Sequence, residues 1–295
     1  MVVQSTLILF GSFFAMLLIG VPISAGIGLA SIVTAFSTGI PADKFALAAA
    51  QRCFSGVDSF SLLALPFFTL GGNIMNKGGI AKRLIRMARI FVGKIPGYLA
   101  ATNVLANMFF GAVSGSSVAD TSALGSILIP AMEKEGYPPA TSAGITVASS
   151  TMGMIIPPST PMVVYAMISG ASIGALFMAG AVPGILIGLT QLVLVYVISH
   201  RKGWHPAKSE FSAKRFWKAI FSGIPALLMP LFIIVCVSFG ICTASESAGV
   251  AVLYSMIVGF FIYKELTWKD VWNALKKTLI SSSSVMIIIG FSSIF

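Results

Sequence analysis

Two stretches decide the fold: SGSSVAD at residues 114–120 and IIPPSTP at residues 155–161. Both interrupt strongly apolar sequence with polar or helix-breaking residues. Hydrocarbon offers an unpaired backbone group no hydrogen-bond partner, so such a break persists in a membrane only where protein encloses it or where it lines a cavity. Many secondary transporters hold ions and anionic substrates at broken helices of this kind. The two breaks therefore indicate a transport protein.

The composition places the rest of the chain in a membrane. Of the 295 residues, 57% are hydrophobic and 9% are charged, which is typical of an all-α polytopic membrane protein. The formal charge of +10 does not indicate nucleic-acid binding, because the basic residues lie between apolar runs, as they do in cytoplasmic loops. We therefore expect lipid, and not nucleic acid, around most of the chain.

Three basic clusters, at residues 77–94, 201–218 and 264–277, set the expected topology, and we place all three in the cytoplasm. The apolar runs then divide the chain into three parts. Residues 1–200 form a first inverted repeat, with spans at 2–19, 26–36 and 60–75, a cytoplasmic amphipathic helix at 77–94, a re-entrant hairpin at 98–133, a broken helix at 140–168 and a span at 175–198. Residues 201–218 form a basic linker, and residues 219–295 begin a second repeat, with spans at 219–240 and 248–262.

An internal duplication underlies this division. The motifs GVP and AGIGLA within residues 20–30 have counterparts in GIC and AGVA within residues 240–251. An odd number of crossings separates the two copies, so the second copy is inverted in the membrane, a plan that recurs among secondary transporters. The second copy ends before a hairpin of its own, and we expect the chain to be a fragment or the product of a truncated gene.

The two breaks offer ligands for a small cation. The half-helix that ends at Ser114 presents unpaired carbonyl groups, and the half-helix that starts at Ser117 presents unpaired amides. Proline removes backbone donors in the second break, which leaves the carbonyl groups of Gly153 and Ile156 free to face the hairpin tip. Hard oxygen ligands suit Na⁺ better than a transition metal. Serine and glycine also favour close packing of membrane helices, so a purely structural role is the alternative.

Acidic and histidine side chains are the further candidates. Asp120 follows the hairpin tip, and we favour a role as the cap of the second half-helix over a role as a proton carrier. Asp58 and Glu246 lie beside apolar runs, where an interfacial position and a functional position fit equally well. His200 and His205 lie in a basic loop without a catalytic pattern such as HExxH, so we expect no enzyme.

Several motifs, in order along the chain, resemble the large membrane subunit of the TRAP (tripartite ATP-independent periplasmic) transporters. They are LALPFFTLGGNIM at residues 63–75, GAVSGSSVAD at 111–120, GSILIPAM and GY within 125–137, and IIPPSTPM at 155–162. The resemblance covers essentially the whole chain. It implies an elevator-type transporter of the bacterial inner membrane that takes up an organic acid with Na⁺ as the coupling ion. It also implies two partners, a small membrane subunit and a periplasmic solute-binding protein.

The resemblance further implies a Na⁺ site at the first hairpin, formed by Ser114, Ser116, Gly153, Ile156 and Pro158. We expect hydroxyl groups near the breaks to meet the substrate carboxylate, and these belong to Ser117, Ser159 and Thr160. The acid stays open among C4-dicarboxylates, sialic acid, sugar acids and keto acids, because the binding protein would make much of the selection. A stand-alone ion-coupled anion carrier of related architecture is the alternative function, followed by a membrane enzyme or scaffold.

Overall fold

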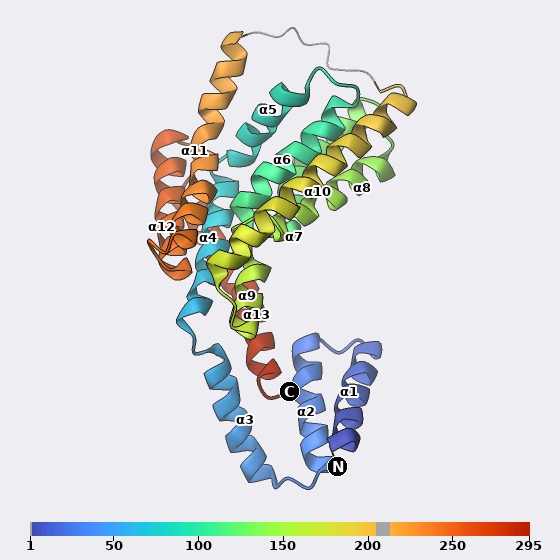
Figure 1. Ribbon diagram of the computed structural model, residues 1–295, viewed down its shortest axis with the longest axis vertical. Helices are drawn as coiled ribbons and strands as arrows, with labels where there is room; N and C mark the ends of the chain where they lie inside the picture. The colour runs from blue at the N-terminus through green and yellow to red at the C-terminus, as the bar shows by residue number, and fades with distance from the viewer. Residues whose placement is uncertain (1, 205–212) are drawn as a thin grey trace. The chain divides into compact units, whose positions relative to one another are not determined.

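A computed structural model describes residues 2–204 and 213–295, and the chain is helical almost throughout this part (Figure 1). No β-strand occurs among the described residues. The chain divides into two compact units, one made of residues 1–62 and 279–295 and the other of residues 63–278. His205 and most of the predicted basic linker lie outside the described residues.

The first unit contains three helices near the N-terminus, namely α1 (Val2–Leu18), α2 (Ile23–Ser37) and α3 (Ala42–Val57). Glycine ends α1 and α2, because Gly20 and Gly39 adopt φ angles of +88° and +74° that side chains rarely allow. Pro22 and Pro41 then precede α2 and α3, since proline fits the start of a helix but not its interior. Close packing of α1 on α2 places Phe13 against Gly26.

The helix α3 was not predicted from the sequence, which left residues 42–57 unassigned between two expected spans. The reason is that charged and polar residues, among them Asp43, Lys44 and Arg52, weaken its apolar pattern, and its side chains include none that are buried. The expected spans at 2–19 and 26–36 coincide with α1 and α2. These helices have 17 and 15 residues, fewer than the roughly 20 that an untilted span of a bilayer needs.

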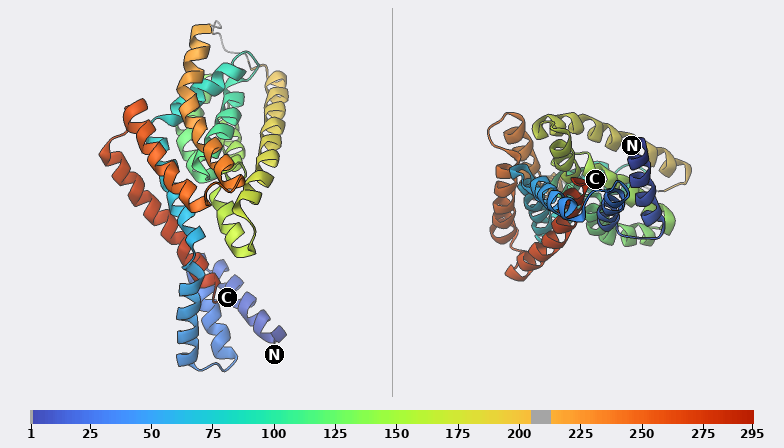
Figure 2. Two further views of the ribbon diagram at one scale, coloured as in Figure 1. Left: turned by 60° about the vertical axis from the view of Figure 1, so that its left-hand side comes forward. Right: turned by 90° about the horizontal axis from the view of Figure 1, so that it is seen from below.

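The second unit is built around the hairpin of α6 (Tyr98–Ser114) and α7 (Ser117–Lys134). The other elements are α4 (Ala64–Lys77), α5 (Ile80–Val92), α8 (Pro139–Ser150), the 3₁₀ turn η2 (Thr151–Met154), α9 (Thr160–Ser169), α10 (Ile173–Arg201), α11 (Ala213–Ser238) and α12 (Ala244–Ile257) with the π-helical turn η3 (Val258–Ile262). The division between the units falls after residues 62 and 278, so the 3₁₀ turn η1 (Phe60–Leu63) and α13 (Trp268–Ser292) each have residues in both units. Helices α5, α7, α8 and α10 all pack against α6, and α12 lies along α4 (Figures 1 and 2). Phe68, Phe110 and Phe177 fill the centre of this packing.

Among the described residues, four helices are long and apolar enough to cross a membrane: Ile173–Arg201, Phe216–Ser238, Ala244–Ile262 and Trp268–Ser292. A fifth span results if the bent pair α3 and α4 is counted as one. Large apolar side chains lie exposed on these helices, for example Leu186, Val193 and Leu194 of α10. Such a surface suits lipid and not water. The protein is therefore an all-α polytopic membrane protein.

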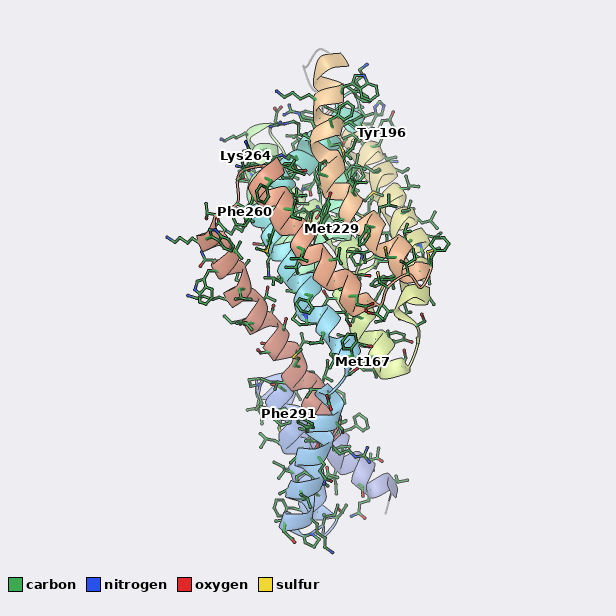
Figure 3. All side chains as sticks on the ribbon, turned by 90° about the vertical axis from the view of Figure 1, so that its left-hand side faces the viewer. Met167, Tyr196, Met229, Phe260, Lys264 and Phe291 are labelled. Carbon is green, nitrogen blue, oxygen red and sulfur yellow. The ribbon has the colours of Figure 1, made fainter. Side chains whose placement is uncertain are left out.

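Two contacts fix the end of α12 within the second unit. The Ser255 hydroxyl of α12 donates to the Ala251 carbonyl at 2.6 Å and lies 3.5 Å from the sulfur atom of Met229 of α11, which Figure 3 labels. Beyond η3 the chain turns at Lys264, where φ is +54°, and Phe260 packs on Trp268 with ring centroids 5.1 Å apart (Figure 3). These contacts connect α11, α12 and the start of α13.

Helix α5 is amphipathic, and its position falls within the predicted range 77–94. It buries Leu84, Met87 and Ala88 and exposes basic side chains on the opposite face. Arg83 lies at the edge of the buried face and joins α5 to the segment after α12. Its guanidinium group pairs with Glu265 at 2.8 Å, donates to the Gly79 carbonyl at 2.9 Å, and lies 3.8 Å from the ring centroid of Tyr263.

The Arg83 contacts predict unequal effects of two substitutions. Arg83→Ala should lower the free energy of unfolding by about 1–2 kcal/mol, because it removes a stacked cation and two hydrogen bonds. Glu265→Gln should cost less than about 0.5 kcal/mol, because the Glu265 side chain is 42% exposed and water screens the pair. Thermal unfolding in detergent measures both, with Arg86→Ala on the exposed face as control. Equal losses for Arg83→Ala and Glu265→Gln would contradict this prediction.

Candidate functional site

The hairpin tip is a two-residue turn between α6 and α7. Gly115 ends α6 with φ at +62°, and its N–H group donates to the Gly111 carbonyl at 3.0 Å. Ser116 then adopts an extended conformation and caps α7 by accepting a hydrogen bond from the Ala119 N–H group. The Ser116 N–H group donates to the Ser114 hydroxyl at 3.1 Å. Both serines are thus held by the turn itself.

The second break follows from three prolines that cannot donate hydrogen bonds. In a continuous helix the carbonyl groups of Gly153 and Met154 would accept from residues 157 and 158, but both are proline. The Met154 carbonyl accepts instead from the Ser159 hydroxyl at 2.6 Å. The Ile156 N–H group donates to the Met152 carbonyl at 2.7 Å, so it does not donate to the Gly153 carbonyl. The Gly153 carbonyl is thereby left as a candidate ligand.

The two breaks touch each other through their backbones. The Thr160 N–H group donates to the Gly115 carbonyl at 3.3 Å. A Cβ atom at Gly115 would lie 2.7 Å from the Pro158 carbonyl oxygen, and one at Gly111 would lie 2.7 Å from the Cα atom of Gly153. Contacts this close require glycine. The predicted residues Ser114, Ser116, Gly153 and Pro158 therefore lie around one place, enclosed by the second unit.

Asp120 lies at the same place, in a role that differs from the expected one. We expected it to cap α7, but Ser116 does so. The Asp120 side chain is fully buried, and one carboxylate oxygen, Oδ1, accepts a hydrogen bond from the Ser114 hydroxyl. The other oxygen, Oδ2, has no hydrogen-bond partner and lies against Gly153. A buried carboxylate beside unsatisfied oxygen atoms fits a neighbouring cation, because a positive charge would offset its cost of burial.

The other predicted site residues are placed less centrally. Ile156 is buried and faces Gly184 of α10, where a Cβ atom would lie 2.5 Å from its Cγ1 atom. Ser117 and Thr160 are half-buried, whereas Ser159 is fully buried and its hydroxyl is used within the break. Of the three expected substrate residues, two are therefore half-buried and one is fully buried.

Asp58 and Glu246, which the sequence left open, lie outside this site. Asp58 is exposed and ends α3. Glu246 forms a capping box with Thr243 at the start of α12, with the two backbone-to-side-chain hydrogen bonds at 2.8 and 3.2 Å. The geometry explains Glu246 as a structural residue. No group of three His, Cys, Asp or Glu side chains that could hold a metal occurs among the described residues.

Sequence reasoning missed a buried polar ladder that aligns α6 with α8. The Asn103 amide donates to the Thr146 hydroxyl at 2.7 Å, and the Asn107 amide donates to the Ser149 hydroxyl at 2.9 Å. Asn107 also donates to the Asn103 side chain at 2.8 Å. All four side chains are buried. Gly111 follows Asn107 by one turn of α6, and Gly153 lies in the turn η2 directly after α8, so the ladder sets the alignment of the two breaks.

A second missed residue is Gly72 of α4. A Cβ atom there would lie 3.1 Å from the Cα atom of Ser114, so α4 supports the hairpin tip from behind. The available signals were the pair of asparagines four residues apart in an apolar run and the Gly71-Gly72 pair in α4.

A helical membrane protein whose chain breaks twice at one enclosed place, with oxygen atoms gathered there, has the architecture of a secondary transport protein. The family described as "Tripartite ATP-independent periplasmic transporter, DctM component" matches residues 10–295. The chain therefore belongs to this family, which consists of transporter permeases and not of enzymes.

Individual relatives agree with this assignment. The chain is 41% identical to the uncharacterized protein YgiK of Salmonella typhimurium over 97% of its own length and 65% of the relative. It is 36% identical to the C4-dicarboxylate TRAP transporter large permease protein DctM of Rhodobacter capsulatus (99% and 69%). It is also 36% identical to the sialic acid TRAP transporter large permease protein SiaM of Vibrio cholerae (91% and 61%). The chain thus spans about two-thirds of the length of these relatives.

Proposed function

We propose that this chain forms the part of a TRAP large permease that binds Na⁺ and couples it to uptake of an organic acid. The observation that supports this most directly is the contact between the hairpin tip and the proline break, made by the Thr160 N–H group and the Gly115 carbonyl. Two broken segments that meet in this way gather carbonyl and hydroxyl oxygens in one enclosed place. Such an arrangement is a recurrent ion site of secondary transporters.

The ligands proposed for Na⁺ are oxygen atoms of Ser114, Ser116, Gly153, Ile156 and Pro158. Bound there, Na⁺ would supply a positive charge near the buried carboxylate and near the carbonyl groups that accept no hydrogen bond. The chain's own contribution is to keep these oxygen atoms from pairing with its N–H groups, which proline and the Gly115 turn achieve. Hard oxygen ligands without thiol or imidazole groups favour an alkali or alkaline-earth cation.

The proposed substrate is an organic acid bound beside the Na⁺ site. Relatives are named for C4-dicarboxylates and for sialic acid, both of which carry carboxylate groups. The half-buried hydroxyls of Ser117 and Thr160, at the starts of α7 and α9, are the proposed contacts, with Ser159 holding the break beneath them. Helix N-termini favour negative charge, so both positions suit a carboxylate.

Membership of the family supports a proposal about partners and location. We propose that the complete transporter lies in the bacterial inner membrane, with a small membrane subunit alongside and a periplasmic binding protein that delivers the acid. Within it, residues 1–200 would form a first inverted repeat and residues 219–295 the start of a second. Three consecutive helices begin each of the two parts, namely α1, α2 and α3 in the first and α11, α12 and α13 in the second, which supports this division.

Uptake in proteoliposomes that contain the complete transporter and its partners tests the coupling ion. Uptake should require a Na⁺ gradient, and Ser114→Ala or Ser116→Ala should reduce it about 10- to 100-fold, because each removes an oxygen atom at the proposed site. Ser126→Ala is the matched control, since Ser126 is exposed on α7 and bonds within its own helix. The proposal would be refuted if the rate of uptake changed neither with the Na⁺ gradient nor with the two substitutions.

A stand-alone carrier is the competing function. Deleting the gene for the periplasmic binding protein separates the two, because a TRAP permease would lose uptake and a stand-alone carrier would retain it.

A further inference from the structure

Asp120 is the single fully buried carboxylate in the described part of the chain. Burial of a carboxylate costs several kcal/mol unless it is paired, so its presence beside the breaks calls for a reason. It lies one turn into α7, at a point where three segments of the second unit meet. These segments are the end of α6, the start of α7 and the turn η2.

The two oxygen atoms of Asp120 face different walls of the proposed Na⁺ site. Oδ1 accepts from the hydroxyl of Ser114, which is the last residue of α6. Oδ2 lies against Gly153 of η2, where a Cβ atom would overlap it, and a Cβ atom at Gly111 of α6 would lie 3.3 Å from it. Asp120 therefore spans from the hairpin to the broken helix.

We propose that Asp120 is a positioning residue that sets the distance between the two walls of the Na⁺ site without binding the ion itself. The inference rests on the proposed function. Asp120 acts through two contacts. It orients the Ser114 hydroxyl, and it fixes how closely Gly153 approaches the hairpin, because the carboxylate and the Gly153 backbone are packed together without space for one additional carbon atom.

This role makes a specific prediction about Gly153. A methyl group at Gly153 meets Asp120 first, and the next atom in its way, the Cα of Gly111, is at an ordinary contact distance of 3.4 Å. Gly153→Ala should therefore push the walls apart while Asp120 is present. Removing the Asp120 carboxylate should make room for the methyl group, so the two substitutions should not act independently.

The experiment uses the complete transporter with its partners and measures the Na⁺ concentration that gives half-maximal uptake and the shift of the melting temperature on adding Na⁺. Asp120→Ala should raise the half-maximal Na⁺ concentration at least about tenfold, with uptake at saturating Na⁺ changed less than about twofold. Asp120→Asn keeps an acceptor for Ser114 and a similar shape but not the negative charge, so it should recover part of the loss. Ser122→Ala, exposed on the same helix, is the control.

The double variant completes the test. Gly153→Ala alone should weaken the Na⁺ response about tenfold, whereas in the Asp120→Ala background it should add less than about twofold. If Asp120→Ala does not accumulate in the membrane, Asp120→Asn and Gly153→Ala are compared with the wild type instead. The same two quantities are measured, namely the half-maximal Na⁺ concentration and the shift of the melting temperature on adding Na⁺. The proposal is overturned if effects of the two substitutions multiply, if Asp120→Asn is as impaired as Asp120→Ala, or if neither Asp120 variant changes the response to Na⁺.

The readouts separate this inference from the proposed function. A wild-type protein that shows no Na⁺-dependent shift in melting temperature and no Na⁺-dependent uptake contradicts the proposed function. A wild-type protein that responds to Na⁺, with Asp120 variants that respond equally well, contradicts the positioning role alone.

Discussion

Gly115→Ala is expected to abolish Na⁺-dependent uptake and to lower the free energy of unfolding by about 2–4 kcal/mol. Two costs combine at this position. Gly115 has a φ angle of +62°, which costs other residues about 1–2 kcal/mol. In addition, a Cβ atom would lie 2.7 Å from the Pro158 carbonyl oxygen, and that oxygen belongs to backbone that has no freedom to move aside. The substitution would force the two breaks apart.

Gly136→Ala is the matched control, because it isolates the first of these costs. Gly136 has a φ angle of +88° and no atom within 4 Å of the position of a Cβ atom. We expect a loss of about 1–2 kcal/mol in the free energy of unfolding and normal uptake. Thermal unfolding in detergent and uptake in proteoliposomes measure the two effects. If both glycine variants behave alike, the contact between the breaks does not govern the site.

Asn103→Ala is expected to lower the free energy of unfolding by about 1–3 kcal/mol and to impair uptake, because it removes the centre of the ladder between α6 and α8. Asn103 is fully buried, donates to Thr146 at 2.7 Å and accepts from Asn107 at 2.8 Å. Without it, the buried Asn107 amide loses one of its two side-chain acceptors and keeps only the Ser149 hydroxyl of the two, and the Thr146 hydroxyl loses its donor. The alignment of Gly111 with Gly153 should loosen as a consequence.

Asn73→Ala provides the control for this prediction. Asn73 is half-buried on α4 and makes one hydrogen bond between side chains, to Thr278 at 3.0 Å. Hydrogen bonds of this kind contribute about 0.6 kcal/mol on average in a membrane protein, so a loss below about 1 kcal/mol is expected. The melting temperatures of the two variants, measured in the same detergent, show whether Asn103→Ala is the more destabilising substitution. A larger loss for Asn73→Ala than for Asn103→Ala would contradict the importance of the ladder.

The positions of the two breaks were readable from the sequence because they depend on local backbone chemistry. Proline at residues 157, 158 and 161 removes donors wherever it stands, and a glycine ends one helix while the serine after it caps the next in many contexts. The half-helices around both breaks accordingly lie where they were predicted. Helix α3 was missed because its charges hide an amphipathic helix that buries no residue in this chain.

The sequence by itself therefore determined that this is a helical membrane protein with two interrupted segments, and its motifs indicated the family. Only the tertiary structure decided that the interruptions meet, that Asp120 joins Ser114 to the Gly153 wall, and that asparagines align α6 with α8. The physical reason is the range of the interactions. Caps and prolines act on residues within one helical turn. The contacts between the two breaks, between Asp120 and Gly153 and between α6 and α8 join residues about 30 to 45 positions apart, and their partners depend on how whole helices pack.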